Sequence, residues 1–343
     1  MAIRIGLMGF GRLGRNIFRI LSSRDDVEIA AISDVAEHKA LEYLLRFDTV
    51  FGRFPGEVSI EGGRLRLGEK SIPVLSGKDP GDVCWSDVGA EIVVEATARP
   101  RTREVIERHI EQGAKKVILC VPPLDEPDIT VVMGVNERDL RPEHRIISNA
   151  SCTAHCLGPI AKVLHESFGI RQGFVTTVHA YTNAQRLADV PAGDMRMSRA
   201  AAENIIPSDT RSHELVMHLL PALKGKLGGM AMNVPVPDGS VIDLVVTLDR
   251  KTTRDGINAA IRDAANTRLT GIVQYETYPI VSSDVTGNPH SAIFDSMATL
   301  MLGDDMVKVL AWFDNSWGYS NRVLDVVKRL TAQAGMAAQG VSQ

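Results

Sequence analysis

The chain has 343 residues, which is long for a single core and typical of two domains of about 100 to 200 residues each. Hydrophobic residues make up 44% and charged residues 23%, so each domain can bury a core without disulfides or a structural metal. The formal net charge is −4, from 38 basic and 42 acidic residues spread along the chain. That balance provides no basic stripe for a phosphate backbone, and we expect no nucleic-acid partner.

Four cysteines, at 84, 120, 152 and 156, are too few for a disulfide scaffold and lack the second pair that a zinc site would need. We expect reduced thiols and no metal. The sequence also contains neither an apolar leader nor an apolar run of membrane-spanning length. A cytoplasmic protein with no membrane partner is therefore expected.

The first 150 residues alternate strand and helix patterns. Residues 3–8 are apolar and β-favouring, 9–14 form a glycine turn, 15–22 repeat apolar residues at helical spacing, and 27–32 are strand-like again. Further strand-like runs follow at 91–96, 116–121, 129–135 and 145–147, with an amphipathic helix at 102–112. This alternation predicts an α/β domain with a doubly wound parallel sheet over 1–150.

A different pattern begins after Asn149. It runs through a helix at 153–165, a strand at 173–181, an irregular polar segment at 183–198, a helix with apolar residues from 215 to 223, and strands at 241–248 and 306–313. We expect residues 151–316 to form an α+β domain with a mostly antiparallel sheet covered by helices. An amphipathic pattern over 321–334 predicts that a C-terminal helix within 317–343 completes the first domain.

Gly9, Gly11 and Gly14 form a G-x-G-x-x-G motif between the first strand and the first helix, and Asp34 closes the second strand. In that context the motif is typical of a Rossmann-type dinucleotide site: glycines admit a pyrophosphate, the helix N-terminus attracts it, and the carboxylate accepts from ribose hydroxyls. Asp34 favours NAD over NADP, because it would repel a 2′-phosphate. The alternative is a tight turn with a solvent-facing aspartate.

Cys152 lies at the junction of a predicted strand and a predicted helix, and His179 follows on the next strand. A helix N-terminus stabilises a thiolate, and a neighbouring imidazole would complete a thiolate–imidazolium pair able to move protons. The alternative, which spacing alone favours, is that both are packing residues of a core, the usual fate of a lone cysteine or histidine.

Five motifs resemble the phosphorylating glyceraldehyde-3-phosphate dehydrogenase family, in order and at its spacing. They are Gly-Phe-Gly-Arg-Leu-Gly-Arg at 9–15, Ser-Asn-Ala-Ser-Cys-Thr at 148–153, His-Ala-Tyr-Thr at 179–182, Arg-Ala-Ala-Ala-Glu-Asn-Ile-Ile-Pro at 199–207 and Trp-Gly-Tyr-Ser-Asn-Arg at 317–322. The likeness extends from Ile3 to about Leu330.

The resemblance implies that Cys152 attacks an aldehyde, that hydride passes from the thiohemiacetal to NAD, and that phosphate or water cleaves the acyl thioester, with His179 as the base. It further implies that Asn315 holds the nicotinamide carboxamide, that Arg12 and Leu13 wrap the pyrophosphate, and that Cys120 lies near the nicotinamide. A homotetramer is also implied, because the segment at 183–198 corresponds to a loop that crosses a subunit interface in the family.

Several residues depart from the family pattern at its two anion sites. Asn233 replaces a usual arginine, Ala184 removes a side chain beside Thr182, Arg211 replaces a glycine after Thr210, and Met197 replaces an arginine. Near the nucleophile, His155 replaces an asparagine and Cys120 a serine or threonine; His155 has no assigned role. The expected anion-binding residues are Ser151, Thr153, Thr182, Thr210, Arg211 and Asn233.

Three interpretations follow. The first is NAD-dependent oxidation of a small anionic aldehyde other than glyceraldehyde 3-phosphate, with Arg211 in a relocated anion site and release by phosphate or water. The second is an authentic glyceraldehyde-3-phosphate dehydrogenase with rebuilt phosphate sites. The third is a non-catalytic cofactor-binding or interaction protein, which the joint presence of Cys152, His179, Asp34 and Asn315 argues against.

Overall fold

The computed structural model describes the backbone of residues 3–340 and the side chains of residues 3–333. The chain forms two compact units. The first contains the residues up to Val131, Glu137–Ala150 and the residues from Ser320 onward; the second contains Val132–Asn136 and Ser151–Tyr319. Residues 132–136 and 317–319 thus belong to the second unit, whereas the sequence prediction had placed them with the first. Among the helices of residues 3–340, none combines the length and apolar character needed to cross a bilayer.

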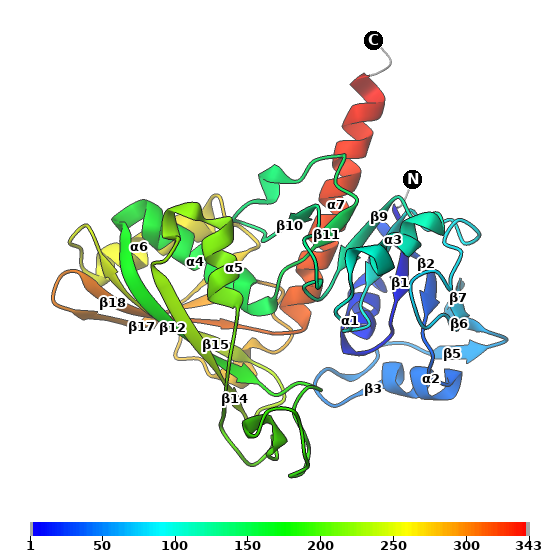
Figure 1. The fold of residues 1–343 in the computed structure, drawn as a ribbon, viewed down its shortest axis with the longest axis horizontal. Coiled ribbons are helices and arrows are strands. Elements are labelled where there is room, and N and C mark those ends of the chain that lie inside the picture. The colour runs from blue at the N-terminus through cyan, green and yellow to red at the C-terminus, as the bar shows by residue number, and fades with distance from the viewer. Residues whose placement is uncertain (1–2, 341–343) are drawn as a thin grey trace. The chain divides into compact units, whose positions relative to one another are not determined.

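The first unit is built on a nine-stranded sheet in the order β10-β11-β9-β8-β1-β2-β7-β6-β5 (Figure 1). Pairing is parallel from β10 to β7 and antiparallel through β7, β6 and β5, which confirms the predicted doubly wound parallel sheet. The strands are β1 (Ile3–Met8), β2 (Val27–Ser33), β5 (Val58–Glu61), β6 (Arg64–Leu67), β7 (Lys70–Leu75), β8 (Ile92–Glu95), β9 (Lys116–Leu119), β10 (Ile129–Thr130) and β11 (Ile146–Ser148).

Several helices accompany the strands of this unit. They are α1 (Arg12–Leu21), α2 (His38–Arg46), α3 (Arg103–Glu111), a short 3-10 turn η1 (Glu137–Asp139) and the part of α7 (Trp317–Gly340) from Ser320; a small hairpin pairs β3 (Phe47–Asp48) with β4 (Gly52–Arg53). α1 begins three residues before the predicted start, because its cap is Gly11 and the turn ends there. The segment with α2 and the strands from β3 to β7 was not predicted.

The strand predicted at 129–135 was too long. Only Ile129 and Thr130 pair with β11. After them the chain turns: Gly134 adopts φ +84°, the Val135 amide bonds back to the Val132 carbonyl, and the Asn136 side chain accepts from the Val132 amide. A run of valines has high strand propensity, but glycine in the left-handed region ends the extended conformation.

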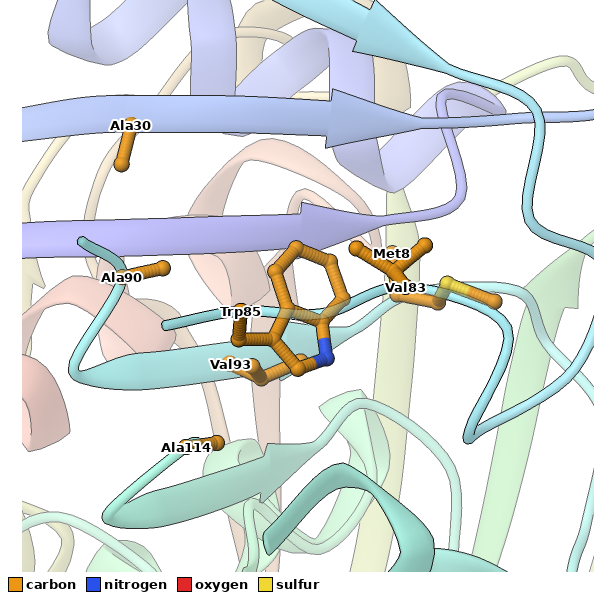
Figure 2. Packing of buried hydrophobic residues seen from close by; sticks show 7 residues of the cluster. All are labelled: Met8, Ala30, Val83, Trp85, Ala90, Val93 and Ala114. Atoms are coloured by element: carbon orange, nitrogen blue, oxygen red, sulfur yellow. The ribbon is translucent and has the colours of Figure 1, made fainter. Parts of the chain in front are cut away.

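Trp85 anchors one core cluster of the first unit. Its indole ring is fully buried and lies at the centre of a group of small and apolar side chains (Figure 2). A Cβ at Gly6 would lie 2.5 Å from this ring, so the glycine in β1 makes room for it. The other members of the cluster are Met8, Ala30, Val83, Ala90, Val93 and Ala114.

The second unit contains a seven-stranded sheet in the order β13-β14-β12-β15-β18-β17-β16. The central strands pair antiparallel, whereas β12 with β14 and β16 with β17 pair parallel, which confirms the mostly antiparallel prediction. Their bounds are β12 (Ile170–Ala180), β13 (Ile206–Ser208), β14 (Leu227–Val234), β15 (Ser240–Leu248), β16 (Val273–Glu276), β17 (Ala292–Leu302) and β18 (Met306–Phe313).

Helices α4 (Cys152–Phe168), α5 (Ser212–Leu219) and α6 (Arg254–Asn266) cover one face of this sheet (Figure 1). Short 3-10 turns lie at η2 (Arg196–Ser198), η3 (Pro221–Leu223) and η4 (Ser282–Val285). α4 packs deeply, and the thiol of Cys156 lies 3.6 Å from the Ala311 carbonyl oxygen in β18. Burial of α4 against the sheet fixes the position of its N-terminus, where Cys152 lies.

Replacing Trp85 by alanine is expected to lower the free energy of unfolding by about 3 to 5 kcal/mol, because the change removes buried apolar area and leaves a cavity. Leu124→Ala is the matched control: Leu124 is 65% exposed in the same unit, and a change of less than about 0.5 kcal/mol is expected. Urea unfolding followed by circular dichroism measures both. Equal midpoints for the two variants would contradict the assigned role of Trp85.

Candidate active site

The three glycines of the turn after β1 differ in what surrounds them, and two of them are sterically required. Gly9 adopts φ +94°, which favours glycine. A Cβ at Gly14 would lie 2.2 Å from the Gly9 carbonyl oxygen, so only glycine allows α1 to approach the turn this closely. At Gly11 a Cβ would meet nothing within 4 Å. Space is therefore open at the point where α1 begins.

This open space faces the N-terminus of α1. Gly11 caps the helix without a side-chain hydrogen bond, and the first turn contains no acidic residue. The first backbone N–H groups of a helix and its partial positive charge attract an anion. Arg12 and Leu13, both half-buried, are the first two residues of this helix. The arrangement fits the pyrophosphate of a dinucleotide.

Asp34 follows β2 and lies beside the glycine turn. Its Oδ2 accepts from the Phe10 amide at 2.7 Å and its Oδ1 from the Ala36 amide at 2.9 Å. These bonds hold the half-buried carboxylate in place, and each oxygen keeps a second lone pair with which to accept from a ribose hydroxyl. The chain thus fits NAD at this turn.

Cys152 is the first residue of α4, whose N-cap is Ser151; the Ser151 hydroxyl accepts from the Ala154 amide at 3.1 Å. The Sγ atom of Cys152 lies 3.5 Å from Nε2 of His179, near the end of β12. The two side chains that sequence spacing left as possible packing residues are therefore in contact, and the sulfur lies at the first position of a helix.

The ring of His179 is held from its other side. Nδ1 donates to the Ala180 carbonyl oxygen at 2.6 Å, so Nε2 faces the sulfur, and Phe313 packs edge-on at 6.0 Å between centroids. Burial alone would lower the pKa of His179. Three opposing contributions outweigh it: the hydrogen bond and charge of Cys152, the bond to the Ala180 carbonyl, and the charge of Asp238. The pKa of His179 therefore lies above its ordinary value. Sequence reasoning missed Asp238, because no motif marks it.

Asn315 lies in the second unit, in the loop after β18, and is 9% exposed. Its Oδ1 accepts from the Ser240 hydroxyl at 3.3 Å, and the Ser240 oxygen accepts from the Ala180 amide at 3.0 Å. Ser240 therefore orients the Asn315 amide and ties it to the residue after His179, a link that sequence spacing does not reveal. The neighbouring Asp314 caps α7 by accepting from the Ser316 and Trp317 amides.

Hydroxyl groups from two helix starts meet beside Cys152. The Ser151 hydroxyl lies 3.1 Å from that of Ser212, the first residue of α5, and Thr210 donates to the same Ser212 oxygen at 3.2 Å. Ser212 was not predicted, since a serine at a helix start is usually a simple cap. Thr153, the second residue of α4, is buried. Two of the expected anion-binding residues, Ser151 and Thr210, are thus joined through Ser212.

The remaining expected anion-binding residues have different surroundings. Asn233 is 8% exposed, lies in register with His179 across β14 and β12, and donates to the Ser208 hydroxyl at 2.9 Å. The side chain of Arg211 is 92% exposed, and its Nε lies 3.3 Å from Glu214. Thr182, also exposed, donates to the Gln185 side chain at 3.1 Å. An anion-binding role for each stays a prediction.

Cys120 and His155, the two residues near the expected chemistry that differ from the family pattern, are both buried. Cys120 follows β9 in the first unit, where burial and the charge of Glu95 raise the pKa of its thiol far above the usual range. His155 in α4 packs edge-on against Tyr319 at 5.9 Å between centroids. Cys120 is therefore a thiol and not a thiolate, and nothing in these contacts gives His155 a chemical role.

Comparison with known proteins identifies the family. Residues 3–103 match the model described as glyceraldehyde 3-phosphate dehydrogenase, NAD binding domain, and residues 151–315 match its C-terminal domain. Glyceraldehyde-3-phosphate dehydrogenase of Geobacillus stearothermophilus is 47% identical over 334 residues, covering 97% of this chain and 99% of the relative. That of Streptomyces coelicolor is 50% identical over 329 residues, covering 95% and 98%.

The glycine turn fits the dinucleotide, the thiol and imidazole are in contact, and the similarity extends over nearly the whole length. The chain belongs to the glyceraldehyde-3-phosphate dehydrogenase family and is an NAD-dependent dehydrogenase of that type.

Proposed function

We propose that the protein oxidises a small anionic aldehyde with NAD, with Cys152 as nucleophile and His179 as base. The observation that carries the proposal is the 3.5 Å contact between Cys152 Sγ and His179 Nε2 at the N-terminus of α4. Cys152 would bond to the aldehyde carbon and His179 would exchange a proton with the oxygen on that carbon, so the two side chains must lie close together.

Proton transfer by His179 accompanies each step at the sulfur. The Cys152 thiolate attacks the aldehyde carbon and forms a C–S bond, while the oxygen takes a proton from the imidazolium to give a thiohemiacetal. Neutral His179 then removes that hydroxyl proton as the carbon loses hydride, and an acyl thioester remains. Bound NAD supplies the hydride acceptor. Attack by phosphate or water breaks the C–S bond and restores the thiolate.

Hydroxyls and helix N-termini support an anion site next to the nucleophile. Ser151, Thr153 and Thr210 place hydroxyl and backbone N–H groups at the starts of α4 and α5, which is the usual chemistry of phosphate recognition. We assign to these hydroxyl and N–H groups the binding of inorganic phosphate, the acyl acceptor. Water is the alternative acceptor, and omission of phosphate from the assay distinguishes the two.

Asn233 favours an aldehyde other than glyceraldehyde 3-phosphate. The family usually has an arginine here, and the amide of Asn233 instead donates to Ser208. A neutral amide cannot replace a bidentate, permanently charged partner, and losing one charged hydrogen bond costs about 1.5 to 3 kcal/mol of binding. Arg211 would compensate only by leaving Glu214 and reaching the substrate, which its full exposure allows.

The second candidate is an authentic glyceraldehyde-3-phosphate dehydrogenase. It is favoured by the identity of 47 to 50% to proteins of that name over nearly their whole length. In this case Thr182, Arg211 and the hydroxyls around Ser212 would together bind the triose phosphate.

We further propose a cytoplasmic homotetramer, as the family resemblance implies. Association is supported by the sheet face of the second unit that the helices do not cover. Strand register places four exposed apolar side chains on that face, namely Phe174, Met230, Leu300 and Leu302. Large exposed apolar patches mark interaction surfaces.

Steady-state NAD reduction with a panel of anionic aldehydes, each with and without phosphate, tests the substrate assignment. We expect kcat/KM for another anionic aldehyde to exceed that for glyceraldehyde 3-phosphate by at least about tenfold, given the lost charged contact. Cys152→Ser should abolish turnover with every aldehyde, because an alcohol is a far weaker nucleophile. A clear preference for the triose phosphate would support the second candidate instead.

The pKa of His179 should depend on Cys152. In the folded parent protein the pKa of His179 lies above the ordinary value of about 6.5. The protonated ring therefore stabilises the fold fully below a pH of about 6.5, and this stabilisation is lost as the pH rises through the pKa of the folded state. In Cys152→Ala the hydrogen bond and charge are lost while burial remains, so the pKa should fall. Histidine NMR titration, with His179→Gln to identify the signal, measures it. An unchanged pKa would show that the sulfur does not interact with the ring.

Asn233→Arg is expected to lower KM for glyceraldehyde 3-phosphate about tenfold or more by restoring one charged hydrogen bond. Asn233→Gln is the control, since it lengthens the side chain without adding charge. Thermal unfolding and NAD affinity, measured on both variants, establish that they fold. If arginine and glutamine have the same effect on KM, position 233 does not select the substrate.

A further inference from the structure

A buried carboxylate lies at the end of β8, outside the residues assigned to the chemistry. Glu95 is 1% exposed, and its Oε1 accepts from the Thr97 amide at 3.0 Å and from the Thr97 hydroxyl. Its Oε2 faces His109 Nε2 at 3.2 Å and Arg101 Nε at 3.8 Å. Burial would raise the pKa of Glu95, but hydrogen bonds from His109 and Thr97 outweigh it and lower the pKa. Glu95 is therefore a charged residue inside the fold.

His109 is fixed by a second buried ring. The indole Nε1 of Trp85 lies 2.9 Å from His109 Nδ1. An indole N–H can only donate, so Nδ1 accepts and Nε2 carries the proton that is donated to Glu95. Trp85, whose ring nitrogen is visible in Figure 2, thereby selects the tautomer of His109. Thr97, His109 and Arg101 all turn N–H or O–H groups toward the Glu95 carboxylate.

The two bonds to Thr97 restrain the turn that follows β8. Ala98 adopts φ +57°, in the left-handed region that costs alanine more than glycine. Its side chain is exposed, so packing does not impose this conformation. The two Glu95–Thr97 bonds hold the residue immediately before Ala98.

Sheet topology places this turn at the cofactor crevice. β1 lies between β2 and β8, and the chain leaves β1 toward β2. The strand order thus reverses between β1 and β8, and in such sheets ligands bind at the carboxyl ends of the strands at that point. The turns touch there: a Cβ at Gly9 would lie 2.8 Å from Ala96 C and Thr97 N.

We propose that Glu95, held by His109 and Arg101, is a positioning residue that keeps the Thr97–Ala98 turn in the conformation that binds the dinucleotide. Glu95 is buried and acts through Thr97, not on the cofactor itself. The restraint raises affinity because the turn is already ordered before NAD binds. This inference concerns NAD binding alone and does not depend on which aldehyde is oxidised.

Glu95→Gln tests the proposal. The glutamine amide has one oxygen and one NH2 group. The NH2 group must face either Thr97 or the pair His109 and Arg101, which are all donors, so the hydrogen bonds on that side are lost in either orientation. We expect the Kd for NAD, measured by isothermal titration calorimetry, to rise about tenfold. The kcat at saturating NAD should stay within about threefold. Glu107→Gln, which removes an exposed carboxylate of α3, is the matched control and should leave Kd unchanged.

A second substitution that restores NAD affinity to Glu95→Gln distinguishes a role in positioning the turn from a general folding defect. Glycine adopts positive φ without strain, so Ala98→Gly should recover part of the NAD affinity of Glu95→Gln, although it changes only an exposed residue. If Glu95→Gln does not fold, Thr97→Val and Thr97→Ser decide the matter: valine removes the hydroxyl donor to Glu95, and serine keeps it. A parent-like Kd in Glu95→Gln, no recovery by Ala98→Gly, or equal Kd values for the two Thr97 variants would overturn the proposal.

Discussion

The contact between a thiol at a helix start and an imidazole at a strand end is the interaction on which the account of this protein depends. α4 brings Cys152 to its first position, and β12 brings His179 to the same place. A lone cysteine or histidine in a fold is usually a packing residue. The Ala180 carbonyl accepts from Nδ1 of His179, so that Nε2 faces the sulfur. Their positions in the fold bring the two side chains into contact as a thiol–imidazole pair.

Rigid packing around that pair maintains its geometry. α4 is buried over most of the stretch from Thr153 to Leu164, and β12 lies in the interior of the sheet, bonded on one side to β14 and on the other to β15. Ser240 in β15 contacts the Ala180 amide and Asn315, so the backbone beside His179 is fixed by a side chain from a neighbouring strand. In the first unit, Glu95 is buried among donors at the end of β8 in a comparable way. Buried polar groups are stable only when fully satisfied, and such networks specify one arrangement.

The sequence predicted the architecture wherever local pattern decides it. The β1–α1–β2 unit, α4, β12 and β18 appear close to their expected bounds, because glycines and apolar periodicity mark them. Strands β5 to β7 and α2 have no clear pattern in the sequence. The apolar run at 129–135 predicts one strand, because β propensity carries no information about the turn that Gly134 and Asn136 impose. Of the site, Cys152 and His179 were found by motif. Ser212, Asp238 and Ser240 were missed, because residues distant in sequence meet only through strand register and helix packing.

During turnover, the sulfur of Cys152 should become covalently acylated. Acid quenching of the protein with NAD and its preferred aldehyde, in the absence of phosphate, followed by peptide mass spectrometry, tests it most directly. The account predicts an acyl group on the peptide that contains Cys152, lost when phosphate is added before the quench and absent when NAD is omitted. An unmodified Cys152 under conditions of continuing NAD reduction, or acylation of another residue, would contradict it.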